Sequence, residues 1–353
     1  MKCIISGTIF CILAMAGCEA FSAKVSAPEQ ITALVWNVQS LFDGQEAGNE
    51  YAEFREAAGW TEEKYRARIT AISQAIGQIA ANAPDFIGLI EIENSGVLKD
   101  IAGSALSKHG YNWTAFTKLP GQALGIGFLS RFPLKDIKAH SISAGKETAP
   151  RPVLELMVEP RGKPIVFLLC HWKSKLGGET ETIRRSSAKV VQRRLFELHQ
   201  AGAETPVIVM GDLNENHDEF YLCGASILSA LLPDDPEAAA IAANAPGEYL
   251  VLSGEKPPRA VYFPEEVSAF YSPWKEEINE GSYYYKGGWE TIDHFLLSDA
   301  LFSGTGWDYA GFKVLNEEPF VSSKGIPYTY TAKNGRGLSD HLPLLLKLQF
   351  EGE

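Results

Sequence analysis

Hydrophobic and polar residues follow two patterns along the chain. Short apolar runs bounded by polar, Pro or Gly residues predict buried strands. These runs lie at Ala33–Val38 and within residues 85–94, 124–134, 152–160, 164–175, 206–212, 289–299 and 338–350. Two longer segments, 61–85 and 181–202, predict helices. In the first of them Tyr65, Ile69 and Ile72 begin an apolar series with helical spacing, and Thr61 is the expected N-cap.

The order of these elements suggests an α/β sandwich with mainly antiparallel strands and with helices outside. Residues 220–285 break the pattern, because they are rich in Pro, acids and aromatic residues and show no clean periodicity. We expect this segment to form surface loops with short elements.

The N-terminus has the layout of an export signal. Lys2 precedes an apolar run, Cys3–Gly17, which is short for a membrane-spanning helix. The letters AMAGC resemble a bacterial lipobox, in which Cys18 becomes the lipidated first residue, and ordinary cleavage near Ala20 or Ala23 is the alternative. The sequence therefore predicts an exported protein, either a cell-envelope lipoprotein tethered to a membrane through Cys18 or a secreted protein.

Charge and cysteine content narrow the possible functions. The chain has 353 residues and a formal net charge of -12, which argues against a basic clamp for nucleic acid. An acidic enzyme can still turn over phosphates when metal ions neutralise them locally. Of the five cysteines, Cys3, Cys11 and Cys18 belong to the signal region, and Cys170 ends an apolar run. A disulfide scaffold is not expected.

Polar side chains stand at the ends of most predicted strands: Asn37, Glu91, Glu93, His171, Asp212, Asn214, Asp293, His294, Asp340 and His341. Strand ends of a layered sheet fold can converge on one rim. So many acids and imidazoles on one rim would repel one another or lose solvation unless a cation joined them. Carboxylate and amide oxygens suit Mg²⁺, whereas no Cys or His pair has zinc spacing.

Together these residues resemble the endonuclease/exonuclease/phosphatase superfamily. The matching motifs are WNV, PDFIGLIE, CHWKSK, GDLN, IDHFLLS and SDHLP, in the order of the family and over nearly the whole mature chain. IEIEN, HWKSK and WETIDHFLLS are most similar to exported bacterial members often labelled nucleases. The resemblance implies a four-layered α/β sandwich, with two mixed, mainly antiparallel sheets packed face to face and helices outside. This domain would span residues 31–353, after a signal peptide (1–17) and a linker (18–30), with a loop-rich insert at about 220–285.

The resemblance also implies the roles of the polar residues around a metal ion. Glu91 would hold the metal ion, helped by Asn37 and Asp340. Mg²⁺ is the expected ion, with Mn²⁺ or Ca²⁺ as possible substitutes. Asp212 and Asn214 would orient the attacking water and the phosphate oxygens.

The two histidines at strand ends would supply acid–base chemistry. His341 would be the general base or the transition-state donor, and Asp293 would fix its tautomer. His171 would hydrogen-bond the phosphate or protonate the leaving oxygen. His294 should point away from Asp293 by strand alternation, and Glu93 should face the same side as Glu91.

A second group of side chains could contact substrate, with a solvated loop or ordinary packing as the open alternative: Lys173, Lys175, Arg184, Arg185 and Trp289. Tyr283, Tyr284 and Tyr285 could stack on bases together with Trp289, although packing is the favoured interpretation for these aromatic residues.

The sequence thus predicts an exported, Mg²⁺-dependent phosphodiesterase, a nuclease that hydrolyses DNA, RNA or both by metal-assisted attack of water. A lipid or inositol phosphoesterase on the same fold, similar to a sphingomyelinase, is the alternative. An inactive homologue that only binds a partner is the second alternative. No sequence feature indicates a protein partner.

Overall fold

The structure is a computed structural model that describes residues 28–79, 83–144, 150–176, 180–200, 204–264, 267–277 and 279–352. The predicted signal peptide and Cys18 lie outside these residues. None of the helices in the described part of the chain has the length and apolar character needed to cross a membrane.

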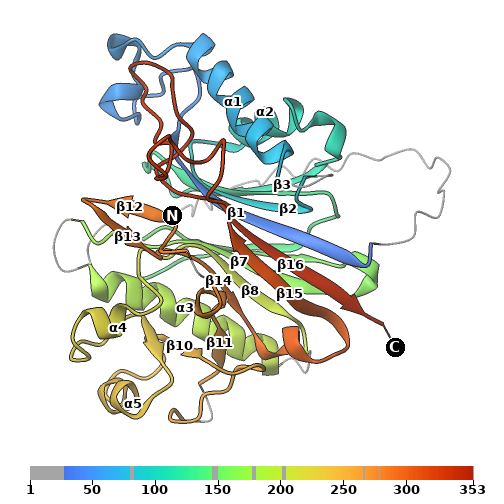
Figure 1. The fold of residues 1–353 in the computed structure, drawn as a ribbon, viewed down its shortest axis with the longest axis vertical. Helices are drawn as coiled ribbons and strands as arrows, with labels where there is room; N and C mark the ends of the chain where they lie inside the picture. The colour runs from blue at the N-terminus through green and yellow to red at the C-terminus, as the bar shows by residue number, and fades with distance from the viewer. Residues whose placement is uncertain are drawn as a thin grey trace, which may run out of the picture.

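Two large sheets form the centre of the molecule (Figure 1). The first sheet has six strands in the spatial order β15 (Gly306–Val314), β16 (Leu344–Glu351), β1 (Gln30–Leu41), β2 (Phe86–Ile92), β4 (Gly125–Ser130) and β3 (Trp113–Thr117). The second sheet has eight strands in the order β5 (Lys135–His140), β6 (Val153–Val158), β7 (Ile165–His171), β8 (Val207–Asp212), β14 (Asp293–Leu297), β11 (Ala269–Tyr271), β10 (Leu250–Ser253) and β9 (Leu231–Pro233). A separate hairpin joins β12 (Tyr283–Tyr285) to β13 (Gly288–Glu290).

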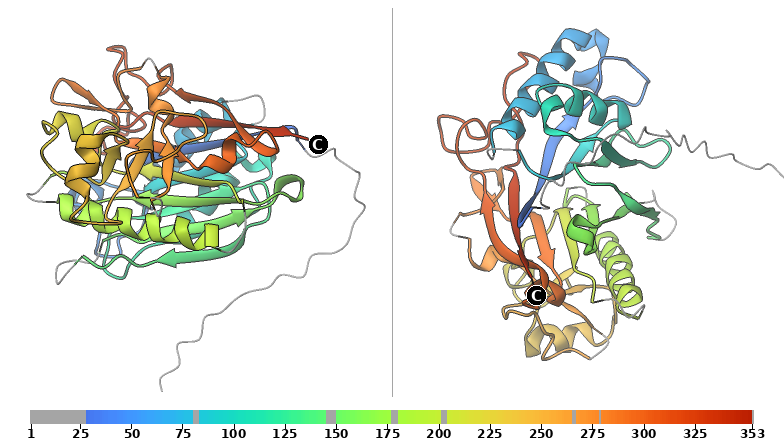
Figure 2. Two further views of the ribbon diagram at one scale, coloured as in Figure 1. Left: turned by 90° about the horizontal axis from the view of Figure 1, so that it is seen from below. Right: turned by 90° about the vertical axis from the view of Figure 1, so that its right-hand side faces the viewer.

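Helices cover the outer faces of both sheets. The α-helices are α1 (Glu62–Gly77), α2 (Ser95–Gly103), α3 (Glu181–Gln200), α4 (Glu219–Leu222) and α5 (Pro236–Ala242). Short 3-10 helices span Ala52–Phe54, Glu56–Ala58, Ser107–His109, Pro160–Gly162, Pro273–Lys275 and Asp299–Phe302. Figures 1 and 2 show α1 and α2 outside the first sheet and α3 outside the second. The predicted four-layered sandwich is confirmed.

Strand β7 shows why the central strands are apolar throughout. Phe167 and Leu169 point into the core between the two sheets, whereas Leu168 and Cys170 point into the second core, beneath α3. Both faces of the strand are buried, so the sequence shows a continuous apolar run instead of alternation. Cys170 is a buried free thiol of this second core.

The N-cap of α1 also matches the sequence expectation. The Thr61 hydroxyl accepts a hydrogen bond from the backbone N–H of Lys64 at 3.3 Å. Such a cap satisfies one of the free N–H groups of the first turn.

Within residues 220–285, short elements extend the second sheet as well as forming loops. Strands β9, β10 and β11 pair in parallel, and β11 joins β14 at the antiparallel pair Tyr271–Leu297. Phe220, Tyr249 and Phe263 belong to a small core of this segment. The strands are too short for a periodic pattern, which is why the sequence did not reveal them.

Candidate functional site

Three neighbouring strands of the second sheet end in polar side chains at one rim of the sandwich. His171 and Asp212 are register partners in the parallel pair of β7 and β8, and Asp293 is the register partner of Asp212 in the antiparallel pair of β8 and β14. Alternation places them on the face of Leu169, Met210 and Phe295, which line the core between the sheets. All three polar side chains are therefore buried at the edge of that core.

The first sheet contributes Asn37 and Glu91 to the same rim. The Asn37 Nδ2 donates to Asp212 Oδ2 at 3.0 Å, and its distance to Glu91 Oε1 is 3.4 Å. Regular alternation would turn Glu91 away from the second sheet, because Gly88 and Ile90 share the face that meets it. Glu91 instead has a positive φ of 66° beside a register shift, which brings its carboxylate to the rim.

A buried arginine fixes the irregular end of β1. Gln39 and Ser40 both have a φ of 53°, and the backbone N–H of Ser40 donates to Glu91 Oε2 at 2.8 Å. The Arg68 guanidinium donates to the carbonyls of Val38 at 2.7 Å and Ser40 at 2.9 Å, and also to that of Gln39. Burial lowers the pKa of Arg68 to about 10, so the guanidinium stays charged at neutral pH.

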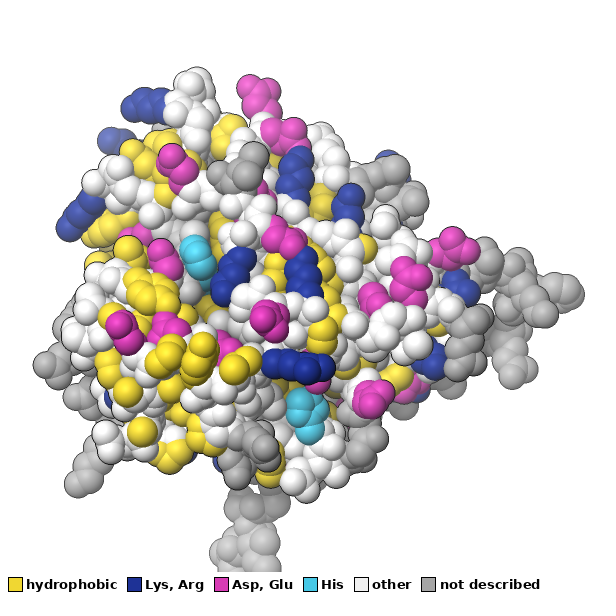
Figure 3. All heavy atoms as spheres, turned by 60° about the horizontal axis from the view of Figure 1, so that its bottom comes forward, with side chains coloured by type: hydrophobic (Ala, Val, Ile, Leu, Met, Phe, Trp, Pro, Cys, Tyr) yellow, Lys and Arg dark blue, Asp and Glu magenta, His cyan; other side chains and the backbone are white. Residues whose placement is uncertain are grey.

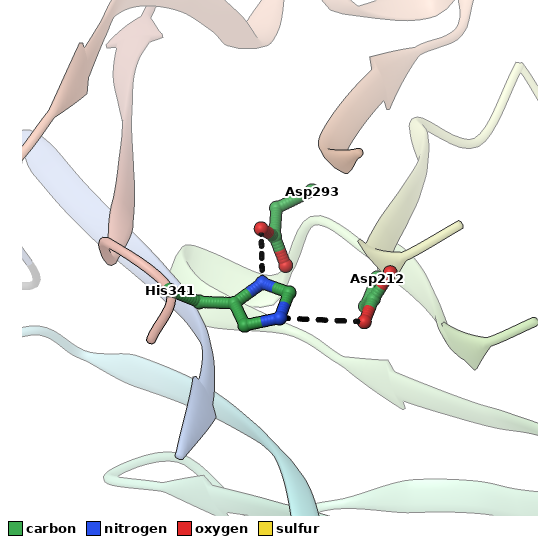
Figure 4. A group of neighbouring side chains, drawn as sticks. All are labelled: Asp212, Asp293 and His341. Atoms are coloured by element: carbon green, nitrogen blue, oxygen red, sulfur yellow. Dashed lines mark hydrogen bonds and ion pairs between the residues drawn. The ribbon is translucent and has the colours of Figure 1, made fainter. Parts of the chain in front are cut away.

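His341 precedes β16 and meets Asp293 across the rim, as Figure 4 shows. The His341 Nδ1 lies 2.7 Å from Asp293 Oδ2, which also accepts a hydrogen bond from the Ser282 hydroxyl at 2.6 Å. The Trp36 indole N–H donates to the His341 carbonyl at 2.9 Å. These contacts fix the orientation of the imidazole and leave its Nε2 toward the rim.

Asp212 lies at the centre of the cluster. Its Oδ2 is 3.7 Å from His171 Nε2 and 4.0 Å from His341 Nε2, in addition to the Asn37 contact. The backbone N–H of Asn214 donates to Asp212 Oδ1 at 2.9 Å. One carboxylate thus contacts or faces groups from both sheets.

The surroundings shift the pKa values of the His341 and His171 imidazoles in opposite directions. Burial alone would lower the pKa of His341, but the carboxylates of Asp293, Asp340 and Asp212 together outweigh it and raise this pKa to about 10. Burial, with the positive charges of Arg151 and His341, holds the pKa of His171 well below its ordinary value. His341 is therefore a cation and a donor, whereas His171 is neutral. Opposed shifts of this kind are typical of acid–base pairs in active sites.

The remaining polar strand-end residues lie at different distances from the centre. Asn214 donates from Nδ2 to the Trp172 carbonyl at 3.3 Å, with a positive φ of 51°. Asp340 Oδ1 lies 4.0 Å from His341 Nε2. Glu93 accepts from the Asp43 backbone N–H, and His294 bonds the Glu215 carbonyl, away from Asp293 as expected.

The basic side chains predicted to contact substrate are mostly engaged in ion pairs. Arg184 is only 4% exposed and binds Glu181 and the fully buried Glu215. This burial and these ion pairs argue against its predicted contact with substrate. Arg185 pairs with Glu248.

The other two predicted cations differ in their surroundings. Lys175 binds Glu219 at 2.7 Å and Glu290 at 3.1 Å, so its charge is already neutralised within the protein. Lys173 is exposed, and its side chain has no ion pair among the described residues. It alone of the four basic residues keeps a free charge beside His171.

Two residues of the rim carry no signal in the sequence. The charge of Arg151 helps to lower the pKa of His171, and its side chain has no hydrogen bond or ion pair among the described residues. Ser282 holds Asp293 from a segment whose composition suggested only loops. Both reach the site through tertiary contacts between distant segments, which sequence patterns do not record.

The fold and this cluster define a hydrolase of phosphate esters, and the sequence comparison identifies its family. The model of the Endonuclease/Exonuclease/phosphatase family matches residues 32–238. The chain belongs to this family. No curated protein sequence matches the chain.

Solved structures show the same fold at low sequence identity. TDP2 from Caenorhabditis elegans is 12% identical with a TM-score of 0.55, and the match covers 93% of this chain and 77% of that one. An endonuclease/exonuclease/phosphatase family protein from Bacteroides thetaiotaomicron is 16% identical with a TM-score of 0.52, covering 91% and 95%. A mannosyl-6-phosphatase from the same organism is 15% identical with a TM-score of 0.51, covering 91% and 100%.

Enzymes of this family use divalent metals, and the rim offers ligands for one. Ligand atoms of Asp212, Asp293 and His341 all lie within 4.8 Å of one another. Asp293 Oδ1 is buried and has no hydrogen-bond partner among the described residues. A buried carboxylate oxygen in that state fits a site that a cation completes.

Replacement of Arg184 tests whether this residue is structural. Arg184→Met should destabilise the protein by about 3 to 5 kcal/mol, because it leaves Glu215 as an unpaired buried charge. Arg185→Met removes a partly exposed ion pair and should cost about 1 kcal/mol or less. Denaturant unfolding of the two variants measures the difference.

A double variant provides the control. Arg184→Met combined with Glu215→Met leaves no buried charge and should be more stable than Arg184→Met alone. An Arg184→Met protein of wild-type stability with a raised KM would instead place Arg184 in substrate binding.

Proposed function

We propose that the protein is an exported, Mg²⁺-dependent phosphodiesterase that hydrolyses nucleic acid. The observation that carries the proposal is the position of Asp212, whose Oδ2 lies within 4.0 Å of an amide and two imidazoles from both sheets. Oxygen ligands, a neutral imidazole and a protonated one together match the demands of phosphate-ester hydrolysis.

Glu91 is the residue we expect to hold Mg²⁺, helped by Asn37 and Asp340, while Asp212 would orient the attacking water. The alternative group uses Asp293 and His341, but a protonated His341 has no lone pair to offer an ion. Glu91 Oε1, in contrast, accepts only the long 3.4 Å contact from Asn37. The bound ion would neutralise phosphate charge and lower the pKa of a coordinated water.

Three side chains, His341, His171 and Arg151, would surround the phosphate. His341 is protonated, so its Nε2 would donate to a phosphate oxygen on which negative charge develops. His171 is neutral and would accept or relay a proton at Nε2. Arg151, free of protein partners among the described residues, would bind a nonbridging oxygen.

Nucleic acid is the proposed substrate class because the motifs resemble those of exported nucleases. The surface charge does not add a general attraction, since Lys and Arg are interspersed with Asp and Glu on the face in Figure 3. Selection would therefore depend on the rim itself. A lipid or inositol phosphoesterase remains the alternative. The mannosyl-6-phosphatase named above has the same fold, so the fold alone does not select a substrate.

Assays with plasmid DNA and RNA test the activity and the metal ion together. Mg²⁺ should support cleavage and EDTA should abolish it. His341→Gln should lower kcat/KM by about a hundred- to ten-thousandfold, because it removes a charged donor. Glu91→Gln should raise the Mg²⁺ concentration needed for half-maximal rate by about tenfold or more.

Glu63→Gln, an exposed acid of α1, is the matched control and should behave as wild type. Release of phosphocholine from sphingomyelin, or of phosphate from inositol or sugar phosphates, without cleavage of nucleic acid would overturn the proposed substrate class.

Arg151→Met tests whether this arginine, which has no partner among the described residues, binds the phosphate. We expect kcat/KM for the diester to fall by about ten- to a hundredfold, which corresponds to one lost charge-assisted hydrogen bond. Arg193→Met, on the exposed face of α3, should leave kcat/KM unchanged. An unchanged kcat/KM in Arg151→Met would remove this residue from the site.

Export and a lipid tether at Cys18 are proposed from the N-terminal sequence. The full chain expressed in a bacterium should incorporate labelled palmitate and fractionate with membranes, and Cys18→Ser should abolish both. Recovery of the wild-type chain from the cytosol, with its N-terminus uncleaved, would contradict export.

A further inference from the structure

The hairpin of β12 and β13 carries a row of aromatic rings that starts at the catalytic cluster. Tyr283 and His341 form an isolated antiparallel bridge, and their ring centroids are 4.5 Å apart with an interplanar angle of 31°. Tyr285 stacks on Tyr283 with centroids 6.0 Å apart and an angle of 15°. We call His341, Tyr283 and Tyr285 the ring ladder.

The two faces of the hairpin have different surroundings. Tyr284 and Trp289 lie on the opposite face, with ring centroids 5.2 Å apart, and Trp289 packs on the main core. This packing argues against the predicted contact of Trp289 with substrate. Tyr283 instead contacts His341 through its ring and through the isolated bridge. The ring ladder therefore belongs to the catalytic face.

An ion triad fixes the hairpin to the loop after β7. Lys175 binds Glu290 of β13 at 3.1 Å and Glu219 of α4 at 2.7 Å. The Ser282 backbone N–H donates to the Glu290 carbonyl, and its own carbonyl accepts from the Leu342 N–H at 2.7 Å. The hairpin is thus attached at its base, next to Tyr283 and His341, which holds the inner end of the ring ladder beside the catalytic rim.

The outer end of the ring ladder is open to solvent. Tyr285 is 36% exposed, although its ring is large and apolar. The Lys286 Nζ lies 5.0 Å from the centroid of the Tyr285 ring. An exposed contact between an ammonium and a ring is weak, so another planar group can replace it.

We propose that the ring ladder is a stacking subsite for an unpaired nucleobase next to the scissile phosphate, with Lys286 contacting the following phosphate. This inference rests on the proposed function. A base in a duplex already stacks on its neighbours, whereas the base of a single strand has a free face for an aromatic side chain. The subsite would therefore favour single-stranded ends, loops or gaps, and any base would fit because every base has a planar face.

Cleavage of two oligonucleotides, compared under the same conditions, tests the ring ladder. One is a short oligothymidylate, and the other is an oligonucleotide of equal length with abasic residues beside the cleavage site. Tyr285→Leu should lower kcat/KM for oligothymidylate by about five- to a hundredfold, the loss expected for one stacked base. The same variant should cleave the abasic oligonucleotide as well as wild type does.

Two further variants serve as controls. Tyr285→Phe keeps the ring and should retain wild-type kcat/KM. Tyr262→Leu removes an exposed tyrosine of the 220–285 segment and should also retain it. Equal losses on both substrates in Tyr285→Leu would show that the hairpin only supports the rim, and no loss on either would exclude stacking.

Binding in EDTA separates failure of this subsite from failure of the proposed nuclease activity. If wild type hydrolyses neither oligonucleotide, fluorescence anisotropy of labelled oligothymidylate still reports the ring ladder. Tighter binding of oligothymidylate than of the abasic oligonucleotide, lost in Tyr285→Leu and kept in Tyr285→Phe, would support the subsite without catalysis. Equal binding of the two oligonucleotides by wild type would overturn it.

Discussion

The buried carboxylate of Asp212 is the point on which the rest of the site depends. A charge at this depth is costly unless donors or a cation meet it, and Asp212 draws them from both sheets. Burial and the nearby Asp293 raise the pKa of Asp212 to about 7, a measure of that cost. The two sheets must therefore come close together just behind it. Gly88 permits this, because a Cβ there would lie 2.7 Å from Met210 and 2.8 Å from Leu169. Close packing of the sheets and the chemistry of the rim are parts of one arrangement.

The regions of the fold that the sequence predicts are those where burial alone decides the residue pattern. Strands β1, β2, β4, β6, β7 and β8 were expected from their apolar runs, and they occupy the middle of the two sheets. The strands that escaped prediction include β3, β5 and β15, which lie at sheet edges. β5 is exposed along nearly its whole length and reads KDIKAH, because charged residues protect an edge from further pairing. An edge strand therefore lacks the hydrophobic signal by which strands are recognised.

For the site, the sequence predicted the polar residues at strand ends, but it did not predict the backbone conformation that sets the direction of their side chains. Glu91 and Glu93 were expected on one side of β2. The left-handed conformation of Glu91 breaks that alternation, and Glu93 instead accepts from Asp43. Such a conformation costs about 1 to 3 kcal/mol and persists only where surrounding contacts impose it. Ser40 binds the Glu91 carboxylate, and Arg68 in turn holds three carbonyls at this end of β1, from a helix whose pattern gave no hint of this role. Likewise, both partners of Lys175, and the partner Glu215 of Arg184, come from remote segments, so proximity to His171 in the sequence was misleading.

The positions of the cations explain how an acidic protein can act on an anionic substrate. Most basic side chains near His171 are neutralised by partners, as the pairs of Lys175 and Arg184 show. The protonated His341 lies at the rim, and the positive charge of Arg151 acts on the neighbouring His171. A substrate held by so few charges needs another source of affinity. Aromatic stacking on the hairpin, as proposed above, would supply one that does not depend on net charge, and the hairpin lies next to the same imidazole. The rigid strand ends would then decide which bond is cleaved, while the hairpin would decide which substrates stay bound long enough for cleavage.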